Sequence, residues 1–510
     1  MNKPTLIVSL LIIAGTLILM GTTYAYFTAM ATSNEQKVQS GTLVLTYSTG
    51  KNISLENVNP TEEENAGIHQ FAIENTGTLK ATYYMYLDNI TLKKGETNAQ
   101  SGNLKWKLYK TNESYVEQEE IANGNFSDGN NTIEMNTDIT IEPSEKQYYI
   151  LKIWLQETGA LQNEDQGLIF SGQVVATTEK KAVNKSLANL MKQEAVLDNI
   201  TSTYVTSDTG IDFSQISSDT NGKGLYTLHG TESNPNPIMY YRGDVENNNV
   251  KFANFCWKIV RTTETGGVKL IYNGEPNASG QCMNTTGDST RIGTSTFNAS
   301  NNDNAYVGYM YGTTGASSYE ETHANTNDST IKGVIDSWYE ENMTEYTNRL
   351  EDTVWCNDRS VVSDSTYSGT GAGTEATGYG ARNRLYVNRT PTLECINEND
   401  RFTVSEENGN GALTYPVALL TADEIAYAGG VNGSTNISYY LYTNTTFWSL
   451  SPFYFSGGFA RVFRVGSTGN LYNDRVSSTC GVRPAVSLRP GVKVTSEGDG
   501  TMENPYIVVE

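Results

Sequence analysis

The first 25 residues constrain the rest of the chain most strongly, because they determine the compartment in which it folds. An uncharged, mainly apolar run at residues 5–21 follows Lys3. Positions 23 and 25, just before Tyr26, hold the small residues Thr23 and Ala25. A basic start, an apolar run and small residues at these two positions form an export signal. We therefore predict cleavage between Ala25 and Tyr26. The alternative is retention as a membrane anchor, since about 17 apolar residues is the lower limit for a membrane span. In both cases the chain from Tyr26 onward lies at the cell surface or outside the cell.

Two short motifs follow each other around the predicted cleavage point. They are Tyr24-Ala25-Tyr26-Phe27 and Ser40-Gly41-Thr42-Leu43-Val44-Leu45. This stretch resembles the start of the TasA/camelysin family of exported proteins, and a weaker similarity continues to residue 180. The resemblance implies export through a SipW-type signal peptidase and a jelly-roll-like β-sandwich. Because several members of that family polymerise, it also implies a role in extracellular fibres.

Length and charge limit the architecture and the partners. At 510 residues the chain is expected to form two or three domains. Its formal net charge of -22 argues against nucleic acid and anionic membrane surfaces as partners. Residues 26–180 contain 11 lysines, 21 acidic residues and no arginine, and the first arginine of the whole chain is Arg242. This difference in composition indicates two separate modules.

Alternating apolar and polar residues predict that residues 26–178 form a β-sandwich. Residues 82–87 and 148–155 alternate with a period of two, as half-buried strands do. Asn75-Thr76-Gly77 predicts a turn between strands, because Asn and Gly accept positive φ. Residues 179–204 change to helical spacing and predict a connecting helix and linker. The apolar positions of that helix are Val183, Leu187, Leu190, Met191 and Leu197.

The remaining residues, 205–510, predict an α+β domain in a chain that is mainly β. Apolar runs predict strands at 255–260, 268–272, 447–450, 460–465, 482–488 and 505–509. Asp328-Ser329 is a candidate N-cap of one helix, and Thr421 with Glu424 forms the capping box of another. The Gly-, Ser- and Thr-rich segment 363–380 predicts a loop without regular structure.

Four motifs of this second half are shared by a broad set of surface proteins of low-GC Gram-positive gut bacteria. They are Trp355-Cys356-Asn357-Asp358-Arg359, Leu420-Thr421-Ala422-Asp423-Glu424, Phe447-Trp448-Ser449-Leu450-Ser451-Pro452 and Gly481-Val482-Arg483-Pro484-Ala485-Val486. The last three are similar in order to the end of C-type-lectin-like and formylglycine-generating-enzyme-like folds. This resemblance implies a lectin-like fold for residues 205–510, and it implies no defined activity.

All five cysteines lie in the second half of the chain. Outside the cytoplasm they are expected to pair. Cys256 and Cys282 flank one predicted hairpin, and Cys356 and Cys395 bracket the Gly-rich segment, so we predict disulfides in that order. Cys480 is left over as a free thiol or an intermolecular partner.

No motif identifies a catalytic or metal centre. The histidines are His69, His229 and His323, and none has the spacing of a zinc site. The sequence also lacks a nucleophile elbow and a phosphate-binding loop between a strand and a helix. We therefore predict no cofactor and no enzymatic activity. An extracellular camelysin-like metallopeptidase is the alternative.

Several residues are candidates for a binding site. Glu275-Pro276-Asn277 matches a calcium- and sugar-binding tripeptide of C-type lectins but lacks the downstream partner motif, and Arg242-Gly243-Asp244 spells an integrin-recognition triplet. For both, chance or a framework role is the favoured interpretation. The candidate binding residues are Trp355, Trp448, Arg464 and Arg483, with core packing as the alternative for the tryptophans.

These observations together predict a secreted or surface-displayed bacterial protein with a structural or adhesive role. It would be a fibre or matrix component that presents a binding domain, and a carbohydrate-binding module without fibre formation is a further alternative. The expected partners are other copies of the chain, cell-surface or matrix components, and glycans. Contact with a membrane is expected only through the N-terminal segment. Residues 26–39 either extend the sandwich of a neighbouring molecule or belong to their own domain.

Overall fold

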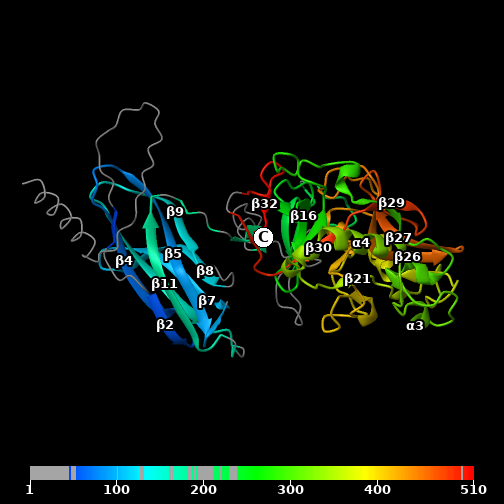
Figure 1. Cartoon of the computed structure of the whole chain (residues 1–510), viewed down its shortest axis with the longest axis horizontal. Coiled ribbons are helices and arrows are strands. Elements are labelled where there is room, and N and C mark those ends of the chain that lie inside the picture. The colour runs from blue at the N-terminus through cyan, green and yellow to red at the C-terminus, as the bar shows by residue number, and fades with distance from the viewer. Residues whose placement is uncertain are drawn as a thin grey trace, which may run out of the picture. The chain divides into compact units, whose positions relative to one another are not determined.

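The computed structural model divides the chain into two compact units, Met1–Val183 and Asn184–Glu510. It describes residues 45–47, 53–99, 101–126, 131–159, 162–163, 165–178, 180–181, 183, 185–188, 190–191, 211–218, 220–228, 238–495 and 498–509. The predicted cleavage pair Ala25 and Tyr26 and the segment 26–39 lie outside these residues. Strands dominate both units, as expected for a mainly β chain of several domains (Figure 1). Across the described ranges, no helix combines the length and the apolar character needed to cross a membrane.

The N-terminal unit consists of strands and a single described 3-10 turn, Glu63–Asn65. The strands are β1 (Leu45–Tyr47), β2 (Ile53–Val58), β3 (Pro60–Thr61), β4 (Gly67–Asn75), β5 (Ala81–Lys94), β6 (Thr97–Asn98), β7 (Ser101–Thr111), β8 (Glu117–Phe126), β9 (Ile133–Ile141), β10 (Lys146–Gln156) and β11 (Leu168–Thr177).

These strands form two sheets that share one core. The first sheet has the order β1-β4-β10-β7-β8, with β3 beside β10, and the second has the order β2-β11-β5-β6, with β9 beside β5. Phe71 and Leu151 of the first sheet and Leu87 and Phe170 of the second belong to the same buried cluster. Two sheets that pack face to face over a common core make a β-sandwich. The alternation of apolar residues therefore predicts the fold of this unit correctly.

Local chemistry explains the position of the turn between β4 and β5. The side chain of Asn75 is buried, and its Oδ1 accepts a hydrogen bond from the backbone N–H of Gly77 at 3.0 Å. Its Nδ2 donates to the carbonyl oxygens of Leu79 at 2.8 Å and Ile141 at 3.3 Å. Asn75 thus closes the turn and ties it to β9.

The expected connecting helix is shorter at its start than the spacing predicts. Lys185–Ser186 forms strand β12, which pairs with β31 (Lys493–Val494), and helical residues begin only at Leu187. Leu187 and Met191 then pack into the core of the C-terminal unit. The segment 192–210, including Leu197, lies outside the described residues. Backbone pairing with β31 outweighs helix propensity at the beginning of this segment.

Two large sheets organise the C-terminal unit. The eight-stranded sheet has the order β13-β14-β16-β17-β30-β25, with β15 beside β16 and β32 beside β15. Its strands are β13 (Gly224–Leu228), β14 (Ile238–Arg242), β15 (Asn249–Phe252), β16 (Phe255–Thr262), β17 (Val268–Tyr272), β25 (Val417–Ala418), β30 (Ala485–Leu488) and β32 (Tyr506–Ile507).

The seven-stranded sheet has the order β18-β29-β26-β23-β22, with β27 beside β26 and β28 beside β27. Its strands are β18 (Gly293–Thr296), β22 (Val361–Val362), β23 (Thr377–Tyr379), β26 (Phe447–Ser456), β27 (Phe459–Val465), β28 (Leu471–Arg475) and β29 (Thr479–Val482). Two short pairs complete the strands, β19 (Met310–Tyr311) with β20 (Asn327–Asp328), and β21 (Trp355–Cys356) with β24 (Arg401–Phe402).

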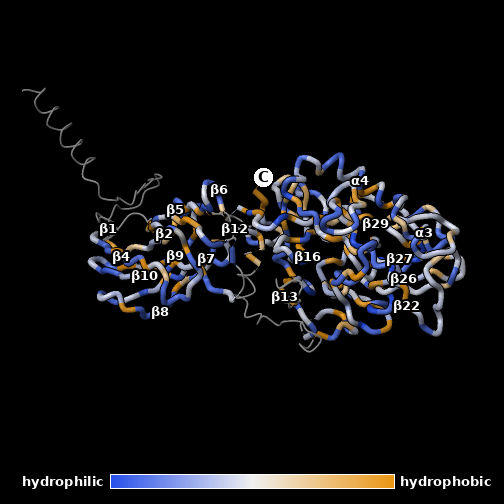
Figure 2. The backbone as a smooth tube through the Cα atoms, turned by 90° about the horizontal axis from the view of Figure 1, so that it is seen from below, coloured by the Kyte–Doolittle hydropathy of each residue, from blue (hydrophilic) through white to orange (hydrophobic). Residues whose placement is uncertain are grey.

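Short helices lie among these sheets. They are α3 (Tyr319–Thr322), α4 (Thr330–Asn342), α5 (Gly380–Arg382) with the π-helical turn Asn383–Asn388, α6 (Ala422–Ala428) and 3-10 turns at Asp288–Thr290, Asn304–Val307, Thr344–Arg349 and Glu398–Asp400. Ser329 caps α4, and Thr421 with Glu424 forms the capping box of α6, both as predicted. Residues of both large sheets, α4 and α6 belong to one buried cluster. In Figure 2, hydrophobic stretches recur along the strands of both units.

The Gly-rich segment 363–380 is more ordered than its composition predicts. Thr377–Tyr379 forms β23, which pairs with β22 on one side and β26 on the other. Tyr367 and Ala372 are buried. The expectation of a loop without regular structure is therefore wrong for part of this segment, because pairing with a distant strand supplies the order that the local sequence does not show.

Candidate functional site

An open cleft of about 970 Å³ lies in the C-terminal unit. Its walls come from β16, β17, β21, α6, the π-helical turn and the segment 392–396. Charged side chains dominate the lining, and the carboxylates outnumber the cations. The carboxylates are Glu264, Glu351, Asp352, Asp358, Glu394, Asp423 and Glu424, and the cations are Arg261, Lys269, Arg384 and Arg401. Leu228, Ile238, Leu393 and Ile396 add an apolar patch.

A buried ion cluster forms one wall of the cleft. Oε1 of Glu424 lies 2.8 Å from Nε of Arg261 on β16 and 2.9 Å from Nζ of Lys269 on β17. Burial alone would raise the pKa of Glu424, but Lys269 and Arg261 outweigh burial and lower it to about 2. Nζ of Lys269 also lies 4.1 Å from the ring centroid of Trp355. Glu424 therefore stays ionised at neutral pH and joins α6 to two strands.

The capping box of α6 positions this carboxylate. Oε2 of Glu424 accepts a hydrogen bond from the backbone N–H of Thr421 at 3.0 Å, while Oε1 faces the two cations. The hydroxyl of Thr421 in return accepts from the N–H of Glu424 at 3.0 Å. A local helix signal thus also builds the cleft wall.

Asp423, the residue before Glu424, binds another cation of the cleft lining, Arg384. Asp423 accepts two hydrogen bonds from Arg384, at 2.9 Å from Nε and 3.0 Å from Nη2, and Nη1 of Arg384 lies 2.6 Å from Asp358. Burial opposes the charge on Arg384, but Asp423 and Asp358 outweigh burial and raise its pKa. This planar, bidentate arrangement fixes the guanidinium against the wall.

Two further carboxyl groups lie at the rim of the ion cluster. Glu351 accepts hydrogen bonds from Thr263, at 2.9 Å, and from Thr265. Burial raises the pKa of Glu351 in spite of these bonds. Glu264 lies 3.2 Å from Arg261, and its side chain is 39% exposed. Glu264 and Glu351 therefore place two carboxyl groups at the rim of the cleft.

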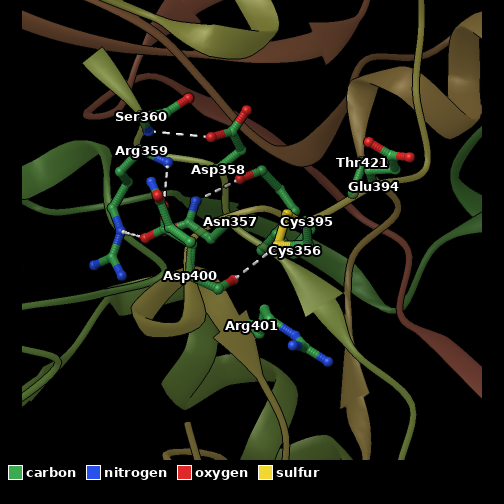
Figure 3. The surroundings of a disulfide bond; sticks show 12 residues. Cys356, Asn357, Asp358, Arg359, Ser360, Glu394, Cys395, Asp400, Arg401 and Thr421 are labelled. Atoms are coloured by element: carbon green, nitrogen blue, oxygen red, sulfur yellow. Dashed lines mark hydrogen bonds and ion pairs between the residues drawn. A yellow bond between two sulfur atoms is a disulfide. The ribbon is translucent and has the colours of Figure 1, made fainter. Parts of the chain in front are cut away.

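The motif Trp355-Cys356-Asn357-Asp358-Arg359 contributes Cys356 and Asp358 to the cleft lining, and Figure 3 shows its last four residues. Trp355 is buried beside Lys269, and Cys356 forms a disulfide with Cys395. Asn357 accepts a hydrogen bond from the N–H of Tyr309 at 2.9 Å and donates to the carbonyl of Leu450 at 2.7 Å. Each position of the motif therefore has its own structural role.

Arg359 completes this support. Its Nε lies 2.6 Å from Oδ1 of Asp400, and both side chains are buried, at 0% and 1% exposure. Its remaining N–H groups donate to the carbonyl oxygens of Met310, at 3.0 Å, and Asn399, at 2.9 Å. The ion pair and the disulfide together hold the segment that contains Glu394 and Ile396 at the cleft. Figure 3 shows these two links. Removing one partner of such a buried ion pair lowers the free energy of unfolding by about 3–5 kcal/mol.

The candidate binding residues are not brought together. Trp448 and Arg483 are almost fully buried; Nε1 of Trp448 donates to the carbonyl of Ser295, and Arg483 donates to the carbonyls of Tyr272 and Leu441. Both therefore support the framework rather than contact a ligand. Trp355 is also buried, although its neighbours line the cleft.

Arg464 is the fourth candidate binding residue. It forms an ion pair with Asp474 at 3.1 Å on the seven-stranded sheet, outside the cleft lining.

The structure joins Cys256 to Cys282 and Cys356 to Cys395, the two pairs that the sequence predicts. Cys480 lies on β29 as a buried free thiol, and burial raises its pKa. Cys480 is 3% exposed, which favours the free thiol over an intermolecular disulfide.

The triplet Arg242-Gly243-Asp244 belongs to the framework. Arg242 is fully buried and donates to the carbonyls of Ala426 and Tyr427 at the C-terminal end of α6. A cation at a helix C-terminus satisfies carbonyl groups that lack partners within the helix. In Glu275-Pro276-Asn277, Oδ1 of Asn277 accepts hydrogen bonds from the N–H groups of Ser279 and Gln281, which makes a turn.

The histidines do not converge. His69 is half-buried on β4, and His323 is buried with Nε2 3.0 Å from the carbonyl of Gly371. His229 lies outside the described residues. Over the described ranges, no group of three or more His, Cys, Asp or Glu side chains is arranged to hold a metal ion.

Sequence reasoning missed Arg261, Lys269, Arg384 and Asp423. Lys269 interrupts a run that is predicted to be buried, and Arg261 directly follows another, which is the local signal that they have buried partners. Arg384 gives no such signal, and Asp423 appears only within the shared motif at 420–424.

Comparison with known families concerns the first unit. Residues 7–171 match the sequence model of the camelysin metallo-endopeptidase family. No curated protein matches the chain. The family match spans about a third of the chain and does not include the cleft. The N-terminal part of this chain is therefore camelysin-like.

Proposed function

We propose that this chain is an extracellular display protein whose camelysin-like sandwich carries a ligand-binding domain of lectin-like character. Export through a SipW-type peptidase and a place at the cell surface or in a matrix belong to the same proposal. The observation that carries it is the cleft of the C-terminal unit. Its charged groups are held in place by the Glu424 cluster, the Arg384 fork and the Cys356–Cys395 disulfide. Fixed polar groups beside an apolar patch are typical of binding sites for small polar molecules.

The charge of the cleft lining indicates that the ligand carries positive charge. Seven carboxylates face four cations around the cleft, and Glu264 is the carboxylate at the ion cluster with the most exposed side chain. An oligosaccharide that carries amino groups would complement this excess of negative charge. The apolar side chains Leu393 and Ile396 would contact the C–H faces of the sugar rings.

A glycan array probed with the full chain tests this binding function. We expect binding to amino sugars and weaker binding to neutral glycans. Loss of one charge-assisted hydrogen bond in Glu264→Gln should weaken binding about tenfold, from a contribution of about 1.5 kcal/mol. The matched control is Glu246→Gln, which removes an exposed carboxylate that is not part of the cleft lining. Equal binding by wild type and Glu264→Gln, or no binding to any glycan, contradicts the assignment.

Assembly through the sandwich is the structural part of the proposal. β1, which follows the segment 26–39 in sequence, lies at one edge of its sheet. β8 forms the opposite edge and carries exposed Glu117, Glu119 and Glu120, and such charges disfavour pairing there. Residues 26–39 of one molecule would therefore add to the β1 edge of the next and form an open filament.

Electron microscopy of the mature protein tests the filament. Deletion of residues 26–39 should abolish filaments and leave a folded monomer. A mature protein that remains monomeric at high concentration, in salt and at mildly acidic pH, rules out this mode of assembly. Display by the N-terminal anchor would then be the better account.

Residues 7–171 match a family of metallo-endopeptidases, which favours a second candidate, an extracellular metallo-endopeptidase. Metal analysis of the purified chain, with a protein-cleavage assay in the presence and absence of a chelator, distinguishes the two. One zinc ion per chain and chelator-sensitive cleavage would support the peptidase. Absence of both would support display.

A further inference from the structure

A row of arginine and aromatic side chains crosses the seven-stranded sheet outside the cleft. Tyr454 on β26 lies opposite Arg461 on β27, and Arg461 lies opposite Arg475 on β28. Residues directly opposite on antiparallel strands project from the same face of the sheet. Phe459, two residues before Arg461, shares this face. We call Tyr454, Phe459, Arg461 and Arg475 the arginine row; none of its members lines the cleft.

The two arginines of the row are like charges in an unfavourable position. Like charges directly opposite on neighbouring strands destabilise a sheet. Nearby arginines have carboxylate partners, since Arg382 pairs with Asp364 at 2.8 Å and Arg464 with Asp474 at 3.1 Å. Among the residues that the structure describes, Arg461 and Arg475 form no ion pair with a carboxylate.

Asp474 does not neutralise the row. It precedes Arg475 directly, so it projects from the opposite face of β28. There it accepts from Nε of Arg464 and from the hydroxyl of Ser478.

Both guanidinium groups lie on aromatic rings. Arg461 lies 5.6 Å from the ring centroid of Tyr454, and Arg475 lies 3.6 Å from that of Phe459. Tyr454 in turn stacks on Tyr367 at 5.3 Å. A guanidinium held against a ring keeps its in-plane N–H groups directed outward, where they can bind an oxyanion in bidentate fashion. Arg461 uses one such group on Oδ1 of Asn473, at 3.2 Å.

Protection of the sheet edge explains only part of this arrangement. β28 is an edge strand, and charge on an edge strand prevents pairing with other chains. That role accounts for Arg475. It does not account for Arg461, because β27 pairs with β26 on one side and β28 on the other.

We propose that the arginine row binds an anionic polysaccharide that lies across β26, β27 and β28. A carboxylate or sulfate group of the polymer would bridge Arg461 and Arg475 and relieve their repulsion. The rings of Tyr454 and Phe459 would contact the sugar. The chain's net charge of -22 does not prevent this, because charges farther away than about 8 Å are largely screened at physiological ionic strength.

Binding of the full chain to immobilised polymers tests the proposal. The probes are polygalacturonate, which carries carboxylates, and dextran sulfate, which carries sulfates; neutral dextran and polyglutamate are the comparisons. The variants are Arg461→Gln, Arg475→Gln and the double variant. Arg349→Gln is the charge-matched control, since Arg349 ends the 3-10 turn Thr344–Arg349 and belongs neither to the row nor to the cleft. Unfolding curves establish that each variant is folded.

We expect binding to at least one of the two anionic polysaccharides and none to neutral dextran. Each single variant should weaken this binding about tenfold, as expected for one charge-assisted contact, and the salt dependence should fall by about one charge per arginine. The polymer that binds more tightly identifies the oxyanion. Unchanged binding by the folded double variant, or an equal loss in Arg349→Gln, overturns the proposal. Tighter binding to polyglutamate than to either polysaccharide also overturns it, because the surface would then be a site for acidic polypeptides.

Discussion

Replacing Glu424 by glutamine separates the charge of this residue from its role in capping α6. Glutamine fits the same position of a capping box, so the helix start should be preserved. The substitution leaves Arg261 and Lys269 buried without their shared carboxylate. The pKa of Glu424 falls from 4.5 to about 2 on folding, which at about 1.4 kcal/mol per pH unit corresponds to about 3 kcal/mol. We therefore expect Glu424→Gln to lower the free energy of unfolding by about 3 kcal/mol at pH 7.

The pH dependence follows from the direction of the pKa change. Glu424 has a lower pKa in the folded protein than in the unfolded chain, so its contribution is complete above about pH 4.5 and is lost as the pH falls towards 2. The difference in stability between wild type and Glu424→Gln should therefore shrink over this range. Glu407→Gln, which changes an exposed carboxylate, is the control and should have little effect at any pH.

Urea unfolding followed by tryptophan fluorescence provides the measurement. Trp355 packs against Lys269 and reports on the cluster directly. A cost below about 1 kcal/mol at pH 7 would refute the reasoning. A difference between wild type and variant that stays the same from pH 7 to pH 3 would refute it as well.

Three further predictions concern the cysteines and processing. Replacing both Cys356 and Cys395 by serine should lower the free energy of unfolding by about 3–4 kcal/mol, because their separation of 39 residues closes a long loop; a loss below about 1 kcal/mol in urea unfolding contradicts this. Cys480 should resist a maleimide reagent in the folded protein and react in urea, and rapid native labelling seen by mass spectrometry would show that it is accessible. N-terminal sequencing of the extracellular protein should start at Tyr26, whereas a chain that begins at Met1 in the membrane fraction contradicts cleavage.

Elements with local chemical signals could be predicted from the sequence. The capping residues Ser329 and Thr421 define the starts of α4 and α6, and the apolar runs define the β16–β17 hairpin. The two disulfides join cysteines that are consecutive in the sequence, as predicted. β23 could not be predicted in the same way, because its Thr377-Gly378-Tyr379 sequence has no apolar period and its order comes from β22 and β26.

The candidate site depends on contacts that no local pattern reports. Arg261 and Glu424 are 163 residues apart in sequence, and the packing of α6 against β14, the strand next to β16, brings their elements together. The tryptophans of the shared motifs are buried because large aromatic side chains stabilise the core, so residue type alone does not indicate a binding role for Trp448. A charged residue within an apolar run, such as Lys269, indicates the candidate site better than the tryptophans do.

A crystal structure of the full chain with the tightest amino sugar from the array tests the central claim most directly. The account predicts the ligand in the cleft, with an amino group within hydrogen-bonding distance of Glu264 or Glu351 and a ring against Leu393 or Ile396. A ligand bound elsewhere on the chain, with the cleft empty, would contradict the claim that this cleft is the binding site.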